Sequence, residues 1–301
     1  MTVRQRPLYA LALRLAAAAV LATLLMLVKL TQKKGVSLPE IMFWRQAVPS
    51  ALLFGYLASR RELHRLRTRR LGSHGRRALI GMTGMVFNFG AVILLPLAIA
   101  TIFGFTTPLF AVALGALILR EQVGPWRWLA VALGFAGVLV IVRPGAMTIP
   151  PLGALVGLGS GFMVALVSIQ IRDLGRTEEP ISTVFYFSLL GAMMMLPVLP
   201  FFAKAHSPAA WLTVIAVGLC GAVFQLLLTA SLRYGSVTSV VVMDYSSLIW
   251  STLYGWAVFA QLPPATTWLG APLIIAAGLV ITWREHRLAK APSPLAATAL
   301  E

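Results

Sequence analysis

The sequence predicts an all-α integral membrane protein with ten transmembrane helices, built from two inverted five-helix repeats. Three observations carry this prediction. Hydrophobic residues make up 59% of the 301 residues and charged residues only 11%, with a mean hydropathy of +0.86, which is far too apolar for a soluble domain. The apolar residues fall into runs long enough to cross a membrane. The second half of the chain also repeats the pattern of the first.

The basic residues lie where membrane loops are expected. The chain carries 25 Lys and Arg against 9 Asp and Glu, a formal net charge of +16. A nucleic-acid-binding protein can carry such a charge, but here Lys and Arg occupy the gaps between apolar runs, with the largest cluster at residues 60–77. This distribution is typical of cytoplasmic membrane loops and argues against nucleic acid as a partner.

The chain offers few residues for a disulfide, a metal or another cofactor. Its one cysteine, Cys220, lies inside an apolar run, so no internal disulfide can form. The four histidines fall in the expected loops and tail, and no HExxH motif is present. We therefore expect neither a metal site nor a cofactor.

Ten apolar runs are expected to form the spanning helices. The first, Leu8–Leu30, is longer than a signal-peptide core and lacks a convincing cleavage site, so we expect it to be retained. Each run is about 20 residues long, enough to cross the hydrocarbon core. The other nine are Glu40–Ser59, Ala78–Leu95, Leu97–Leu119, Trp126–Val142, Leu152–Ile171, Ile181–Phe202, Ala209–Leu232, Val237–Phe259 and Thr267–Trp283.

The repeat defines the domain organisation. At a shift of 140, Trp128 falls on Trp268 and Ile141 on Ile281. At a shift of 137, GMVFN at 84–88 falls on GAVFQ at 221–225. Each copy has five helices, and because five is odd the second copy must cross the membrane in the opposite direction. The expected divisions are a cytoplasmic N-terminus (1–7), the first repeat (8–145), the second repeat (150–285) and a disordered cytoplasmic tail (286–301).

Counting basic residues in alternate loops predicts the orientation. With the N-terminus inside, the cytoplasmic segments hold 18 of the 25 Lys and Arg and the outer loops hold 4, the rest lying in helices. By the positive-inside rule both termini are cytoplasmic. Inverted repeats are the usual framework of secondary transporters, with the substrate site near the midplane between the halves.

Five stretches resemble one known family over residues 8–285. They are Lys29 with FWR at 43–45, TTPLF at 106–110, LREQVGPWRW at 119–128, GFAGVLVIVRPG at 134–145, and DYSSLIWSTLYGW at 244–256. Together they resemble the EamA-type members of the drug/metabolite transporter superfamily. The resemblance implies an inner-membrane secondary transporter that moves a drug or a small metabolite, such as an amino acid, amine, vitamin or nucleoside-like compound, by alternating access. One departure is Gln261, which stands where members often carry an acid matching Glu121.

Asp244 is the leading candidate for binding substrate or a proton. An acid near a helix middle costs roughly 2.5 to 3.5 kcal/mol on insertion scales, so it is retained mainly where it meets a cavity or a partner. Ser247, Ser251 and Tyr254 follow at offsets that place them on the same helix face. Arg14 lies at a similar depth, about 10 Å from the cytoplasmic side, so depth permits an ion pair. Without that pair, Asp244 is expected to carry a proton.

Other polar positions have two interpretations each. Asn88 and Gln225 occupy matching positions in the two repeats. They are expected to contact a ligand or to form hydrogen bonds between helices. Pro108 frees the carbonyl of Gly104, which gives a functional flexible point or a plain packing kink. Lys29 and Arg45 lie toward the outer membrane side. They are placed to snorkel to headgroups or, as the resemblance implies, to bind an anionic ligand group.

Aromatic residues complete the candidate set. Trp44, Tyr186, Trp250 and Tyr254 suit stacking on a planar substrate, although an aromatic belt or packing set has the same sequence pattern. The candidate binding or coupling residues are Asp244, Asn88, Gln225, Lys29, Arg45, Tyr245, Ser247, Ser251, Tyr254, Trp250, Tyr186 and Pro108, with Arg14 as the ion-pair partner.

Three other classes of protein were weighed against a transporter. An intramembrane enzyme is disfavoured because the spans lack paired carboxylates, a metal set and a His-based triad. A channel and a non-transporting scaffold are alternatives that a transport assay would distinguish from a transporter. No P-loop is present, so a coupling proton or an exchanged substrate would supply the energy. The bilayer and a small-molecule substrate are the expected partners, and a homodimer is compatible with the sequence.

Overall fold

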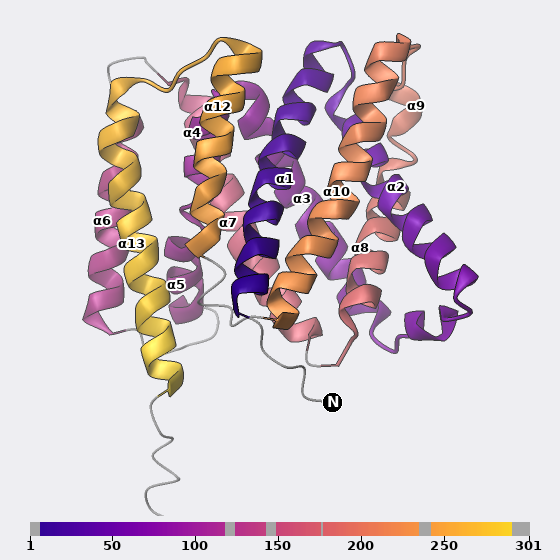
Figure 1. The fold of residues 1–301 in the computed structure, drawn as a ribbon, viewed down its shortest axis with the longest axis horizontal. Coiled ribbons are helices and arrows are strands. Elements are labelled where there is room, and N and C mark those ends of the chain that lie inside the picture. Colours follow the sequence, from indigo (N-terminus) through magenta and orange to yellow (C-terminus); the bar gives the residue numbers. More distant parts are fainter. Residues whose placement is uncertain (1–6, 118–123, 143–148, 176, 235–241, 291–301) are drawn as a thin grey trace, which may run out of the picture.

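Helices that run up and down one bundle make up the protein (Figure 1). The computed structural model describes residues 7–117, 124–142, 149–175, 177–234 and 242–290, and no strand occurs among them. The elements are α1 (Pro7–Lys33), α2 (Leu38–Ser59), η1 (Leu63–Leu66), α3 (Leu71–Leu94), α4 (Leu97–Gly104), α5 (Thr107–Leu117), α6 (Pro125–Val142), α7 (Pro151–Leu174), α8 (Pro180–Met195), α9 (Leu199–Phe202), α10 (Pro208–Tyr234), η2 (Val242–Ser246), α12 (Ser247–Phe259) and α13 (Ala265–Lys290).

Both described ends of the chain lie at the same end of the bundle. α1 begins and α13 ends at the bottom of Figure 1, where the arginine-rich connection between α2 and α3 also lies. We call this the basic end of the bundle. The tail was expected to begin at residue 286, but α13 continues to Lys290, and residues 291–301 lie outside the described part.

Seven segments in the described residues are long and apolar enough to cross a membrane. They are Leu8–Lys33, Leu71–Leu94, Leu97–Leu117, Pro125–Val142, Pro151–Ile171, Pro208–Leu228 and Ala265–Trp283. The expected spans at α2, α8 and α12 are not among them, and α8 and α12 are only 16 and 13 residues long. The protein is therefore a multi-pass membrane protein on length and hydropathy alone.

The third helix begins earlier than hydropathy predicts. We expected it to start at Ala78, but α3 begins at Leu71. Its first two turns carry polar and basic side chains that a hydropathy profile assigns to a loop. Ser73, His74 and Arg77 are nevertheless buried, because these turns pack against α7 and α8. Arg76 and Arg77, counted above as loop residues, are thus part of a helix.

The fourth expected helix is divided near Pro108. α4 ends at Gly104 and α5 begins at Thr107, so Pro108 occupies the second position of a new helix, where its missing N–H is tolerated. The carbonyl of Gly104 is not free, as the sequence suggested. It accepts a hydrogen bond from the Thr107 hydroxyl at 2.7 Å. Of the two interpretations, the packing kink accounts for this geometry.

Two more expected helices are divided. Ile181–Phe202 consists of α8 and the short α9, which are separated by a turn. In Val237–Phe259 the α-helix begins only at Ser247, after the 3-10 turn η2, and residues 237–241 lie outside the described part. These divisions are local, and the chain still crosses the bundle at each segment (Figure 1).

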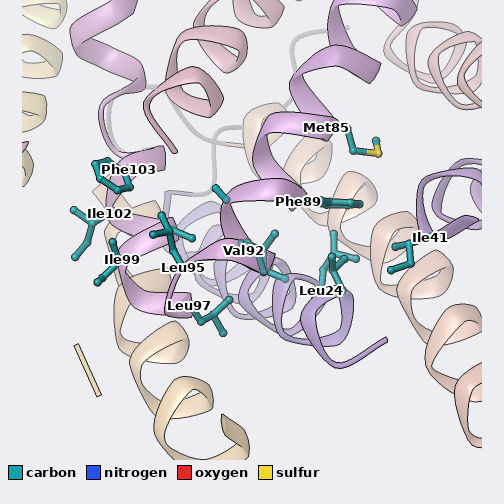
Figure 2. Packing of buried hydrophobic residues seen from close by; sticks show 14 of the residues in the cluster. Leu24, Ile41, Met85, Phe89, Val92, Leu95, Leu97, Ile99, Ile102 and Phe103 are labelled. Carbon is teal, nitrogen blue, oxygen red and sulfur yellow. The ribbon is translucent and has the colours of Figure 1, made fainter. Parts of the chain in front are cut away.

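Helices from the first half of the chain pack mainly on helices from the second half. α1 packs on α10, α2 on α8, α3 on α7 and α6 on α13. The main core lies among α1, α3 and α4, with Leu24, Phe89 and Phe103 fully buried (Figure 2). At the α6–α13 crossing, a Cβ on Gly137 would lie only 2.8 Å from the Gly270 carbonyl, so glycine permits this close approach.

Candidate functional site

Arg14 and Asp244 form a two-bonded ion pair toward the basic end. Arg14 Nε donates to Oδ1 of Asp244 at 2.6 Å, and its terminal NH2 donates to Oδ2 at 2.5 Å. Arg14 comes from α1 and Asp244 from η2, so the pair joins the two halves of the chain. The Arg14 side chain is 9% exposed and that of Asp244 is 39% exposed. Bidentate pairs of this kind are strong and directional.

Asp244 lies at the start of its helical segment and not inside it. The sequence placed it seven residues into a regular helix, but the backbone at Asp244 is a 3-10 turn that precedes α12. This position explains why its carboxylate is partly exposed while Arg14 is buried. The exposed part of the carboxylate is therefore accessible to a competing ligand or proton.

The serines that follow Asp244 line one face of α12, as their spacing indicates. Ser247 Oγ donates to the Asp244 carbonyl at 2.6 Å, and Ser251 Oγ donates to the Ser247 carbonyl at 2.6 Å. Ser251 Oγ also lies 2.7 Å from Thr101 Oγ1 of α4. Both serines are buried. Ser251 thus joins α12 to α4, whereas the Ser247 hydroxyl bonds the backbone of its own segment.

The aromatic candidates on this segment face different neighbours. The Tyr254 hydroxyl lies 3.0 Å from Thr23 Oγ1 of α1. The Tyr245 ring meets Phe105 edge to face at 4.8 Å, in the break between α4 and α5. Trp250 is half-buried. Tyr245 and Tyr254 thus flank the serine face, one toward the kink and one toward α1.

Lys29 is buried among neutral partners at the end of the bundle opposite the basic end. Its Nζ donates to the Leu95 carbonyl at 2.5 Å and to Gln261 Oε1 at 3.3 Å, and it lies 5.4 Å from the centroid of Phe259. Lys29 is only 4% exposed, so its side chain does not snorkel to headgroups. Glu121, the counterpart of Gln261, lies outside the described residues.

Arg45 does not snorkel either. It is 7% exposed, and one terminal nitrogen donates to Gln46 Oε1 at 2.7 Å. Its neighbour Trp44 meets Trp211 edge to face at 5.5 Å and packs against the main core. Trp44 therefore has a packing role, whereas Arg45 has little to compensate its charge.

The matched amides are placed on different helices. Asn88 Nδ2 of α3 donates to Ser160 Oγ of α7 at 3.0 Å, which accounts for it as a contact between helices. Gln225 is half-buried in α10.

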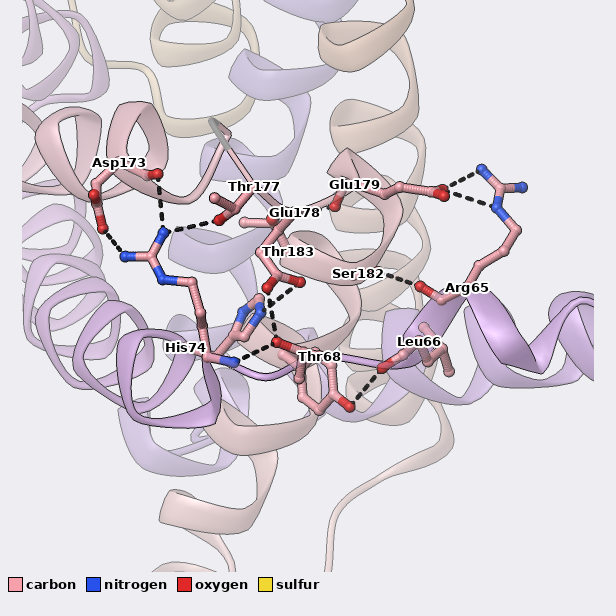
Figure 3. A network of polar contacts seen from close by, with 12 residues as sticks. Arg65, Leu66, Thr68, His74, Asp173, Thr177, Glu178, Glu179, Ser182 and Thr183 are labelled. Carbon is pink, nitrogen blue, oxygen red and sulfur yellow. Dashed lines mark hydrogen bonds and ion pairs between the residues drawn. The ribbon is translucent and has the colours of Figure 1, made fainter.

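A network of polar contacts joins the two loops at the basic end (Figure 3). Arg70 of the α2–α3 connection bonds the Asp173 carboxylate at 2.6 Å and the Thr177 hydroxyl at 2.9 Å. Arg65 bonds Glu179 at 2.8 Å, and Thr68 donates to Glu178 at 2.9 Å. We call this the loop network. The hydrogen bonds that Arg65 donates to the carboxylates of Glu62 and Glu179 raise its pKa above the ordinary value.

Tyr186 contacts the loop network and not Asp244. Its hydroxyl donates to the Leu66 carbonyl at 2.7 Å, and its ring lies 4.7 Å from that of His74. It also lines a pocket of about 730 Å³ on the basic end, together with Arg67 and Arg69. Among the described residues, no three of His, Cys, Asp and Glu gather as a metal site requires.

Sequence reasoning missed several buried polar residues. The sequence predicted Arg77 to lie in a loop. Gln46, which contacts Arg45, was not among the candidate residues. Glu40 was not singled out, yet it pairs with His206 at 2.9 Å near the end opposite the basic end. A signal for Arg77 was present, because Arg77, Gly81 and Asn88 share one face at helical spacing.

The sequence pattern of the EamA-like transporter family matches residues 8–143 and again residues 151–283. Among curated proteins, a riboflavin transporter of Vibrio cholerae is 28% identical over 84% of this chain and 85% of its own length. A pseudopaline exporter of Pseudomonas aeruginosa is 29% identical over 84% and 89%. An S-adenosylmethionine uptake transporter of Rickettsia prowazekii is 25% identical over 82% and 84%.

A solved structure shares the fold. It is described only as the crystal structure of a protein, and it matches with a TM-score of 0.62 at 22% identity. The match covers 91% of this chain and 97% of that one, so the arrangement of helices is similar from end to end.

Proposed function

The chain belongs to the EamA-like transporter family of the drug/metabolite transporter superfamily, and we propose that it carries a small organic metabolite across the cytoplasmic membrane by alternating access. The similar proteins are named as transporters and exporters and not as enzymes. Their named substrates are riboflavin, pseudopaline and S-adenosylmethionine, which sets the range for this chain: a small polar metabolite.

Ten membrane crossings in two inverted repeats are part of the proposal. The family pattern matches twice, once in each half. Helices that match in sequence run in opposite directions: α6 rises from the basic end, whereas α13 descends to it (Figure 1). α2 and the shorter α8 and α12 would then complete the set of crossings.

The ion pair between Arg14 and Asp244 is the observation that carries the mechanism. It joins the halves at one end of the bundle, and its carboxylate is 39% exposed. A cationic group of the substrate, such as an amine, or a proton that binds Asp244 would release Arg14 and loosen this junction. The loop network at the same end would then act as a second closure, since it also joins the α2–α3 and α7–α8 connections.

Replacement of Asp244 by Asn tests the mechanism. Asp244→Asn keeps the side-chain shape and an acceptor for Arg14, so we expect it to fold but to lose coupled transport. Ligands are first found by thermal shift with riboflavin, S-adenosylmethionine, aromatic amino acids and cationic drugs. Counterflow of any ligand found is then measured in proteoliposomes at several pH values. Wild-type rates with unchanged pH dependence would remove Asp244 from the mechanism.

Cysteine labelling tests the orientation. We propose that both termini are cytoplasmic, because residues 60–77 carry eight arginines. In a Cys220→Ala background, a cysteine at the exposed position Arg69 should be shielded from an impermeant thiol reagent in intact cells. A cysteine at the exposed Ser207 should be labelled. The reverse pattern would contradict the orientation.

A further inference from the structure

Two arginines are buried among α2, α3, α8 and α10 without an acidic partner. Arg45 of α2 is 7% exposed and Arg77 of α3 is 6% exposed. Among the described residues, no Asp or Glu lies within ion-pair distance of either guanidinium, although four other arginine–carboxylate contacts are present there. Burial of a charge without compensation is costly, and most strongly so inside a membrane.

A short chain of contacts joins the two arginines. Arg45 donates to Gln46 Oε1 at 2.7 Å, and Gln46 Nε2 donates to the Phe187 carbonyl of α8 at 3.3 Å. The guanidinium carbon of Arg77 lies 4.2 Å from the centroid of the Phe187 ring. Phe187 thus contacts Arg77 through its ring and Gln46, the partner of Arg45, through its carbonyl. Both cations therefore belong to one site.

Arg77 extends toward the middle of the bundle. Cα–Cβ bonds of a helix point toward its N-terminus, which for α3 is the basic end, so a snorkelling side chain would reach the loop. Instead its NH1 lies beside Gly81, one turn farther into the helix, where an added Cβ would run into it. The glycine makes room for a guanidinium that turns inward.

Arg45 lies beside the middle of α10. Its Cγ and Nε lie 3.5 Å from where a Cβ would stand on Gly221. Gly221 follows Pro208, the first residue of α10, by thirteen positions, about 20 Å at the helical rise, which is near the middle of that helix. Glycine again leaves space beside a guanidinium.

Within the part of the chain that the structure describes, several donors of these arginines have no acceptor. They are Nε of Arg45 and both Nε and NH1 of Arg77, all buried. The ring of Phe187 covers a face of the Arg77 guanidinium, but hydrogen bonds form in the guanidinium plane, so the ring does not satisfy these N–H groups. Unpaired buried donors next to a second cation fit an absent oxyanion.

We infer that Arg45 and Arg77 bind the oxyanion, a carboxylate or phosphate, of an acidic substrate. This inference rests on the proposed transport function and narrows its substrate class to anionic metabolites. An oxyanion between the two guanidiniums would pair with both charges and accept the free N–H bonds. Gln46 and Phe187 position the arginines around it.

Thermal unfolding of the purified full chain tests the site. The protein is placed in phosphatidylcholine nanodiscs, and sodium phosphate or sodium succinate is titrated at ionic strength held constant with NaCl. We expect a saturable rise in the unfolding midpoint, because ligand binds the native state. Arg45→Gln and Arg77→Gln should each weaken the apparent affinity roughly tenfold or more. Arg76→Gln, the exposed neighbour on α3, should leave it unchanged.

Arg77→Met separates a binding role from a structural one. Without added anion, removal of an uncompensated buried charge should raise the unfolding midpoint above that of wild type, and the anion response should be lost. A lower midpoint together with an intact anion response would show that Arg77 is only structural and would overturn the inference.

Two further outcomes would also overturn it. If wild type and Arg45→Gln/Arg77→Gln respond equally to phosphate and succinate, the arginines bind no anion. If phosphatidylglycerol in the disc raises the midpoint and abolishes the phosphate response, the site holds a lipid headgroup and not a substrate. The binding assay requires no transport, so its failure contradicts this site alone, whereas absent counterflow contradicts the transport function alone.

Discussion

Among the described residues, buried arginines lie in two places, and these places differ in how the arginine charge is compensated. Arg14 meets the partly exposed Asp244 carboxylate through two hydrogen bonds. Arg45 and Arg77 lie deeper, with a glutamine and an aromatic ring as their neighbours. A compensated pair stabilises the resting protein and must be broken to do work. Two buried arginines without a carboxylate destabilise the resting protein, and only a bound anion offsets that cost.

Removal of the carboxylate from the compensated pair should have the largest effect. Asp244→Ala leaves Arg14 buried and unpaired, and we expect a loss of about 2 to 3 kcal/mol in the free energy of unfolding. This is below the value for a fully buried pair because Asp244 is partly exposed. Denaturant or thermal unfolding in detergent measures it. Asp173→Ala, which breaks the exposed pair with Arg70, is the matched control and should cost less than about 1 kcal/mol.

A double variant that also removes the Arg14 charge tests the same explanation. Arg14→Met combined with Asp244→Ala should recover much of the loss, since no charge stays unpaired. An equal loss in Asp244→Ala and in Asp173→Ala would remove the difference in compensation on which the comparison depends.

Replacement of Phe187 tests whether its ring stabilises the buried Arg77 guanidinium. Phe187→Leu loses aromatic packing and a cation–π contact worth about 1 kcal/mol. In the Arg77→Met background only the packing loss should remain. A double-mutant cycle on unfolding free energies should therefore give a coupling of about 0.5 to 1 kcal/mol. Additive losses would mean that the ring does not hold the guanidinium.

The loop network should show the smallest effect. Arg65→Gln and Arg70→Gln break exposed pairs, so each should lower the free energy of unfolding by about 0 to 1 kcal/mol. This loss should disappear as the salt concentration rises from about 0.1 M to about 1 M. The pKa of Arg65 is raised by its bonds to Glu62 and Glu179. Its contribution is thus fully present below its ordinary pKa and fades only above it, so titration of Arg65 should not alter stability near neutral pH. Unfolding midpoints across salt and pH check both points, and a loss that persists at high salt would contradict a surface role.

Much of the fold could be predicted because hydropathy is a local property. The long apolar runs at Leu8–Leu30 and Leu152–Ile171 needed only their own composition to be assigned as spans, and α1 and α7 contain them. The offsets after Asp244 likewise placed Ser247 and Ser251 on one face, because helical period is local. Helix ends were predicted less well. Polar first turns such as those of α3 become helical when other segments cover them.

The sequence by itself determined the class of this protein, seven membrane-length helices and the family to which it belongs, since each depends on composition, spacing or recurring motifs. Only the tertiary structure decided which polar side chains meet. Depth along a helix permitted Arg14 to reach Asp244, but the packing of α1 against η2 brings them together. The burial of Arg77 depends on room beside Gly81 and on the Phe187 ring, contributed by a helix about 110 residues later. Lateral neighbours in a bundle are set by contacts between distant segments, and hydropathy carries no record of them.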